Sequence, residues 1–150
     1  MIIISRSLIL TMLLGFPLFL QAADNYFLCN TPKGTLSLAD IGEQLVYEMN
    51  NHRGNVFKYI SKAPEYSGFL YNRHSGFQTN YMSVSFVQSG YKYVIISYYE
   101  NGSSERGVTV VDMKTKKNYF YECQNYKIDK LFKLSQKLQC DTDNAVGCYK

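Results

Sequence analysis

The chain has 150 residues, 16 of them basic and 12 acidic, and a formal net charge of +4. This charge is well below that of a typical nucleic-acid-binding domain, and the length suits one domain with a single hydrophobic core. Tyrosine is unusually frequent, since the chain has 14 tyrosines and no tryptophan.

Residues 1–23 have the organisation of a secretory signal peptide. Arg6 supplies a positive head, residues 8–20 form an apolar run, and two alanines precede the expected cleavage point. The run is shorter than the roughly 20 apolar residues that a spanning helix needs, and Pro17 interrupts it. We therefore expect residues 24–150 to be a single soluble, exported, β-rich domain, with 15 basic and 12 acidic residues.

Most of this domain has the composition of β-strands separated by turns. Strands are predicted where β-branched and aromatic residues concentrate, at 25–30, 44–50, 56–61, 67–72, 79–88, 91–100, 107–113 and 118–125. Turns are predicted at 51–55, 73–76, 89–90, 101–106 and 114–117. Within 79–88, Met82, Val84 and Phe86 alternate with polar residues, so they are expected on the core face.

One segment near the C-terminus has helical periodicity. Residues 126–140 place apolar side chains at spacings of three and four, with lysines on the opposite side. We interpret this segment as a surface helix packed on the sheet; a helix that contacts a membrane surface or an acidic partner is the alternative. The predicted fold is therefore mainly β: an antiparallel sandwich or small barrel of seven to eight strands with one C-terminal helix.

The four cysteines predict that disulfides stabilise the fold. An even number in an exported chain favours disulfides, and a zinc site is disfavoured because no Cys-x-x-Cys pair occurs. Three pairings are possible. We favour Cys29 with Cys123, since each follows a run of aromatic strand residues. Cys140 with Cys148 would then close a small turn-rich ring.

Motifs for catalysis, cofactors and metals are missing from the sequence. His52 and His74 are the only histidines, and no Gly-x-Ser-x-Gly, phosphate-binding glycine loop or metal-ligand spacing occurs. A set of His74, Ser75 and Asp112 is conceivable, but nothing in the sequence supports that serine. We predict no catalytic residue, no metal site and no cofactor.

The excess tyrosine predicts a protein-binding surface. Tyrosine and arginine anchor many interfaces, and two predicted turns, 72–75 and 101–106, carry both residue types or adjoin them. The predicted contact residues are Tyr71, Arg73, His74, Tyr98, Tyr99 and Arg106.

Three stretches also carry a family resemblance: the Tyr-Phe-Leu-Cys strand at 26–29, Gly-Glu-Gln-Leu-Val-Tyr at 42–47, and SVSFVQSGYKYVII at 83–96. With the signal peptide, they resemble small periplasmic β-rich inhibitor and immunity proteins of Gram-negative bacteria, which include periplasmic lysozyme inhibitors. The resemblance implies a periplasmic, non-enzymatic protein whose partner is a cell-wall-degrading enzyme or a toxin. It carries over no functional residue.

Two other functions stay open at the level of sequence. One is a small secreted hydrolase that uses His74. The other is a carrier that holds a small apolar ligand inside a barrel.

Overall fold

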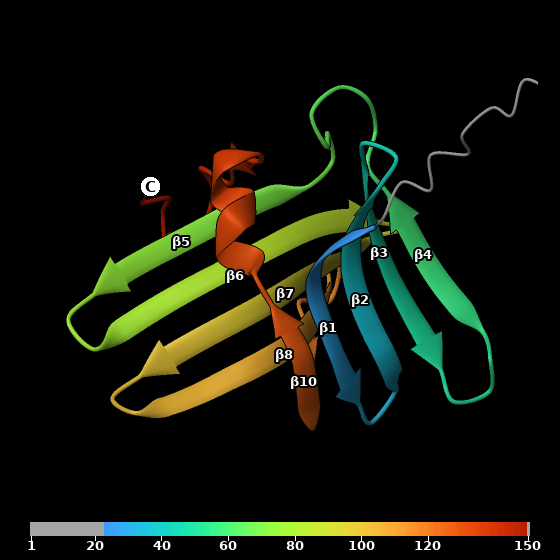
Figure 1. The fold of residues 1–150 in the computed structure, drawn as a ribbon, viewed down its shortest axis with the longest axis horizontal. Coiled ribbons are helices and arrows are strands. Elements are labelled where there is room, and N and C mark those ends of the chain that lie inside the picture. Colours follow the sequence, from blue (N-terminus) through green and yellow to red (C-terminus); the bar gives the residue numbers. More distant parts are fainter. Residues whose placement is uncertain (1–22, 150) are drawn as a thin grey trace, which may run out of the picture.

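The computed structural model describes residues 23–149 as two facing β-sheets (Figure 1). The predicted signal peptide, residues 1–23, lies outside the described residues except for Ala23. The predicted class, a mainly β sandwich with disulfides, is confirmed. The structure contains eleven strands in its described part, against the seven or eight expected, because the strands at 34–41, 125–129 and 139–140 were not anticipated.

The smaller sheet is antiparallel throughout, with the order β10-β1-β2-β3-β4. Its strands are β1 (Asp24–Thr31), β2 (Gly34–Ile41), β3 (Gln44–Asn51), β4 (Val56–Ile60) and β10 (Asn125–Asp129).

The larger sheet has the order β11-β5-β6-β7-β8-β9, in which only the β11–β5 pair is parallel. Its strands are β5 (Leu70–Gly76), β6 (Thr79–Gln88), β7 (Tyr91–Glu100), β8 (Ser103–Asp112), β9 (Asn118–Glu122) and β11 (Gln139–Cys140). The β5–β6 and β7–β8 hairpins extend away from the smaller sheet (Figure 1).

Two predicted turns differ from those in the structure, where two residues suffice to reverse the chain in each hairpin. Asn101 and Gly102 take φ values of 49° and 86°, which suit the right-handed twist of a tight hairpin, so β8 begins at Ser103. The predicted turn at 73–76 is wrong, because β5 continues to Gly76 and the chain turns at Phe77 and Gln78.

The core lies between the sheets and is rich in aromatic rings. On β6, Met82, Val84 and Phe86 are buried as predicted. The ring of Phe86 stacks on Tyr93 at 4.9 Å between centroids and on Tyr59 of the opposite sheet at 4.2 Å. These contacts bind the two sheets through dispersion and apolar burial.

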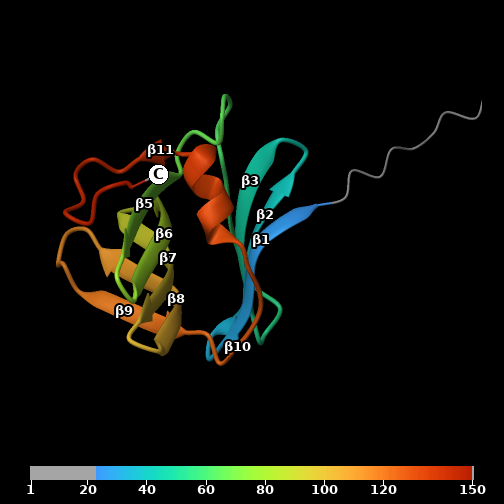
Figure 2. The ribbon, with the colours of Figure 1, turned by 60° about the vertical axis from the view of Figure 1, so that its left-hand side comes forward.

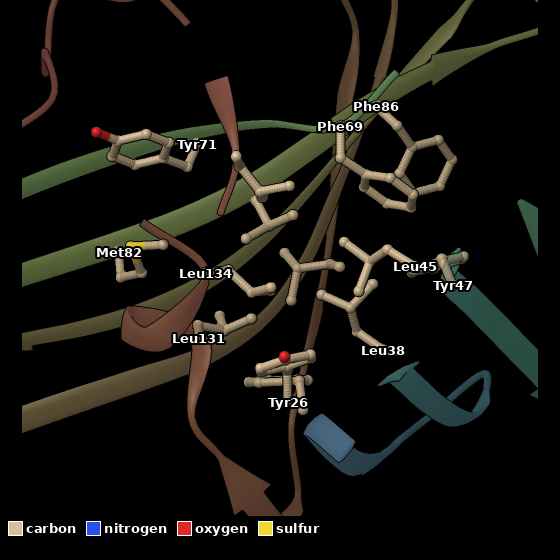
Figure 3. Packing of buried hydrophobic residues seen from close by; sticks show 14 of the residues in the cluster. Tyr26, Leu38, Leu45, Tyr47, Phe69, Tyr71, Met82, Phe86, Leu131 and Leu134 are labelled. Atoms are coloured by element: carbon tan, nitrogen blue, oxygen red, sulfur yellow. The ribbon is translucent and has the colours of Figure 1, made fainter. Parts of the chain in front are cut away.

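The predicted C-terminal helix is much shorter than residues 126–140. Its first part is β10, where Ile128 pairs with Leu28 of β1, and only η1 (Leu131–Gln136), a 3₁₀ helix, follows. Figure 2 shows η1 between the sheets at one end of the sandwich. Its buried Leu131 and Leu134 lie between Met82 of the larger sheet and Leu38 of the smaller one (Figure 3).

Both disulfides have the pairing that the sequence favoured. Cys29 of β1 bonds Cys123, which follows β9, so this bridge joins the two sheets, with the Cα atoms 5.7 Å apart. Cys140 bonds Cys148 and closes the C-terminal loop. Disulfides of this kind are typical of an oxidising compartment.

The C-terminal loop covers the outer face of β5. The Asn72 amide nitrogen donates to the carbonyls of Asp141 and Gly147, over 2.9 and 3.2 Å. Asp141 also forms an ion pair with Lys92 of β7 at 2.7 Å. Ser83, the cross-strand partner of Asn72 on β6, is only 1% exposed.

Candidate protein-binding surface

The sandwich leaves one end of the larger sheet uncovered, and strand alternation divides the predicted contact residues between its two faces. Consecutive strand residues point to opposite faces of a sheet. Register places Arg73, Met82, Ser97 and Arg106 on one row across four strands, facing inward. The neighbouring row, which contains His74 and Tyr98, faces outward. The six predicted residues therefore do not form one site.

Arg106 is the centre of the inward-facing group. Its Nε atom lies 2.6 Å from Oδ2 of Asp129, and its guanidinium carbon lies 4.1 Å from the ring centroid of Tyr126. The hydroxyl of Ser97 donates to the same Asp129 oxygen over 2.6 Å. Ion pairing and ring stacking thus hold the arginine in one orientation.

A pocket of about 170 Å³ lies beside this ion pair. Its lining residues come from β6, β7, β8 and the β10–η1 segment: Asn80, Met82, Ser97, Tyr99, Arg106, Asp129 and Phe132. Two aromatic rings on its rim are open to solvent, since Tyr99 is 45% exposed and Phe132 is 52% exposed.

The turn of the β5–β6 hairpin projects an aromatic ring beyond this pocket. Phe77 is 91% exposed, the highest exposure of any large apolar residue in the described chain. The turn is supported by its neighbour, because the backbone N–H of Asn101 donates to the carbonyl of Gln78 over 3.0 Å. We call Phe77, Tyr99, Arg106, Tyr126 and Phe132 the hairpin-end surface.

Basic residues flank this surface along the chain. Lys127, Lys130 and Lys133 are exposed on β10 and η1, next to the segment that carries Asp129 and Phe132. Asp129 is already neutralised by Arg106. The lysine side of the surface is therefore suited to an acidic partner, whereas exposed Glu100 and Glu105 adjoin Tyr99 and Arg106.

The outward-facing group forms a separate, shallower feature. His74 and Tyr98 line a pocket of about 320 Å³ together with Tyr81 and residues of the C-terminal loop. The His74 ring meets the edge of Tyr149 at 5.4 Å. A hydrogen bond to Glu100 is the main reason that the pKa of Tyr98 is raised.

Tyr71 belongs to neither group. It is 2% exposed and part of the core, so it is unavailable to a partner without unfolding.

The hypothetical set of His74, Ser75 and Asp112 does not assemble. His74 shares its cross-strand row with Glu105, and Asp112 lies seven residues farther along β8. At about 3.4 Å per residue, that separation exceeds 20 Å. No group of three potential metal ligands occurs among residues 23–149.

Sequence reasoning missed Phe77, Tyr126 and Phe132. Phe77 follows Ser-Gly, a turn signal that was assigned to the preceding residues. Phe132 was assigned to the buried side of a helix. An aromatic residue inside a turn is the sequence feature that points to Phe77 as an exposed ring, because a turn has no core to bury it.

Comparisons add no relative to this description. No protein-family model, curated protein or solved structure matches the chain. Within the described residues, no helix is both long and apolar enough to cross a membrane.

Proposed function

We propose that this protein is a periplasmic binding protein that inhibits a cell-envelope-targeting enzyme or toxin through the hairpin-end surface. The observation that carries the proposal is the exposed ring of Phe77 at the tip of a hairpin whose strand β6 lines the pocket together with Tyr99, Phe132 and an oriented Arg106. A single exposed phenylalanine needs no special explanation, but Tyr99, Tyr126 and Phe132 of this surface are exposed as well, and groups of exposed apolar residues mark interaction sites.

The composition of this surface matches that of interface hot spots. Tyrosine, phenylalanine and arginine are enriched at the centres of interfaces, where a few anchors supply most of the binding free energy. Phe77 lies in the two-residue β5–β6 turn and Tyr99 lies in β7 close to the β7–β8 turn, so two paired hairpins hold these rings. Such pre-organisation reduces the entropy lost on binding.

Arginine also explains why an enzyme of the cell envelope is the proposed partner. The ion pair with Asp129 uses Nε, so the two terminal nitrogens of Arg106 keep N–H donors for a second carboxylate. Glycosidases that cleave the cell wall use a pair of catalytic carboxylates in a cleft. A projecting hairpin tip on a sheet that also presents Arg106, with exposed lysines on the β10–η1 segment, fits such an acidic cleft in shape and charge.

The test is inhibition of purified enzymes by the chain without residues 1–23. A panel of lysozymes, lytic transglycosylases and peptidoglycan amidases is assayed on peptidoglycan with increasing inhibitor. We expect stoichiometric inhibition of at least one enzyme. Phe77→Ser and Tyr99→Ala should each weaken it roughly thirtyfold, the effect of losing an anchor worth about 2 kcal/mol.

Tyr119→Ala is the matched control for Tyr99→Ala. Tyr119 is a similarly exposed tyrosine of the same sheet, but it lies on the edge strand β9. The control should inhibit like the wild type. Absence of inhibition across the panel, or unchanged inhibition by Phe77→Ser, would refute the proposal.

A further inference from the structure

A third pocket lies between the two sheets, near the turn that joins β1 to β2. It has a volume of about 310 Å³. Its lining residues come from both sheets: Lys33, Tyr47, Met49, Phe57, Tyr93, Val108, Val110 and Tyr121. None of them belongs to the hairpin-end surface.

The walls of this pocket are apolar and include ordered aromatic rings. Phe57 of β4 stacks on Tyr93 of β7, with centroids 4.9 Å apart and planes 23° apart. Tyr93 stacks in turn on Phe86, whose plane differs by 6°. The rings of the two sheets brace each other, so the pocket is part of a rigid aromatic core.

Three phenol groups bring polarity into this apolar space. Tyr47, Tyr93 and Tyr121 all line the pocket. Burial, followed by the neighbouring phenols of Tyr93 and Tyr121, raises the pKa of Tyr47, and no hydrogen bond is among the causes. The Tyr47 hydroxyl therefore stays protonated and is able to donate to a ligand.

Lys33 supplies the only charge in the lining. Its ammonium lies 5.7 Å from the ring centroid of Tyr121, and it takes part in none of the three ion pairs of residues 23–149. The turn that carries it is fixed by buried Thr31, whose hydroxyl donates to Gly34 O over 3.0 Å and accepts the Lys33 N–H over 3.2 Å. A cation thus lies at the pocket without an anionic partner among residues 23–149.

We propose that this pocket binds a small amphipathic carboxylate, whose apolar or aromatic body lies between the sheets and whose carboxylate meets Lys33 and the tyrosine hydroxyls. Apolar pockets with a few convergent polar groups are the usual form of small-molecule sites. At the interior packing density of about 0.74, the volume holds a ligand of roughly a dozen heavy atoms.

Calorimetric titration of the exported chain with 3-phenylpropionate and with octanoate tests this proposal. The neutral amide of 3-phenylpropionate is the matched ligand, because it keeps the ring and loses the charge. We expect saturable binding of one carboxylate per chain, and affinity for the amide about tenfold lower, which corresponds to about 1.4 kcal/mol. Amide proton shifts measured by NMR should concentrate on the lining residues.

Lys33→Met separates charge recognition from folding, because the side chain is exposed and its turn is held by Thr31. The affinity of this variant for the carboxylate should be about tenfold lower than that of the wild type, and its affinity for the amide should be unchanged. Lys62→Met, at an exposed lysine outside this pocket, is the control and should bind both ligands like the wild type. Val110→Phe should block both ligands by filling the space.

The proposal would be overturned if neither carboxylate saturates the chain below 5 mM, or if the acid and its amide bind with equal affinity. It would also be overturned if the NMR shifts lie away from the lining residues. These outcomes are independent of enzyme inhibition, which depends on the hairpin-end surface.

Discussion

Arg106 and Asp129 form a partly buried ion pair that joins the two sheets, since Arg106 lies on β8 and Asp129 on β10. Their Nε and Oδ2 atoms are 2.6 Å apart, and their side chains are 20% and 14% exposed. A pair in this environment is screened less by solvent than one on the open surface.

Asp129→Asn should destabilise the fold by about 2 kcal/mol, because it removes the charge that Arg106 and Ser97 contact. The measurement is the free energy of unfolding in urea at neutral pH. Glu48→Gln provides the comparison, because the Lys58–Glu48 pair is more exposed, at 46% and 33%. Its loss should cost less than about 1 kcal/mol. Equal costs for the two variants would contradict the structural role given to the Arg106–Asp129 pair.

The two disulfides should differ in their contributions to stability. Cys29–Cys123 closes a separation of 94 residues and Cys140–Cys148 one of 8. The chain-entropy model gives about 4.7 kcal/mol for the first and about 2.6 kcal/mol for the second. Non-reducing urea unfolding of the two paired Cys→Ser variants measures both values, and a larger loss for the C-terminal pair would show that the longer bridge does not determine stability.

Stability should fall in strong alkali partly because of Tyr47. Burial is the largest cause that raises its pKa above the ordinary value of 10.0. The folded chain therefore retains a proton that the unfolded chain releases, so this contribution is complete below about pH 10 and lost as the pH rises further.

Tyr47→Phe should accordingly show a smaller drop in urea midpoint between pH 8 and pH 11 than the wild type. Tyr119→Phe, at an exposed tyrosine, corrects for the effects shared by all variants. If the urea midpoint falls as much in Tyr47→Phe as in Tyr119→Phe, Tyr47 ionises in the same pH range in the folded and unfolded chains.

Local signals explain which strands the sequence predicted. The pair Asn101-Gly102 tolerates positive φ and marks a hairpin, and alternation on β6 identified its core face. β2 was missed although it carries a similar alternation: Leu36 and Leu38 are fully buried, whereas Thr35 and Ser37 are not.

The C-terminal segment shows where local pattern fails. The spacing of Ile128, Leu131 and Leu138 is compatible with a helix, but pairing of Ile128 with Leu28 on β1 makes the first part a strand. Tertiary contacts override a weak helical preference in this way. The local sequence pattern does not show which distant strand this segment will pair with.

The candidate site was predicted only in part for the same reason. Tyr99 and Arg106 were identified by residue type, and both belong to the hairpin-end surface. Asp129 and Tyr126 reach Arg106 from 20 or more residues away in sequence. The strand register places His74 and Tyr98 on the opposite face of the sheet, and the sequence alone did not predict this register.

The most direct test of the proposed partner contact is hydrogen–deuterium exchange of the chain with and without an enzyme that it inhibits. Protection should appear at Phe77 and Gln78, at the Asn101–Gly102 turn, and along η1, because these segments carry or adjoin the hairpin-end surface. Protection confined to the C-terminal loop at 141–149 or to the β4 and β9 edges, with these segments unchanged, would contradict the central claim.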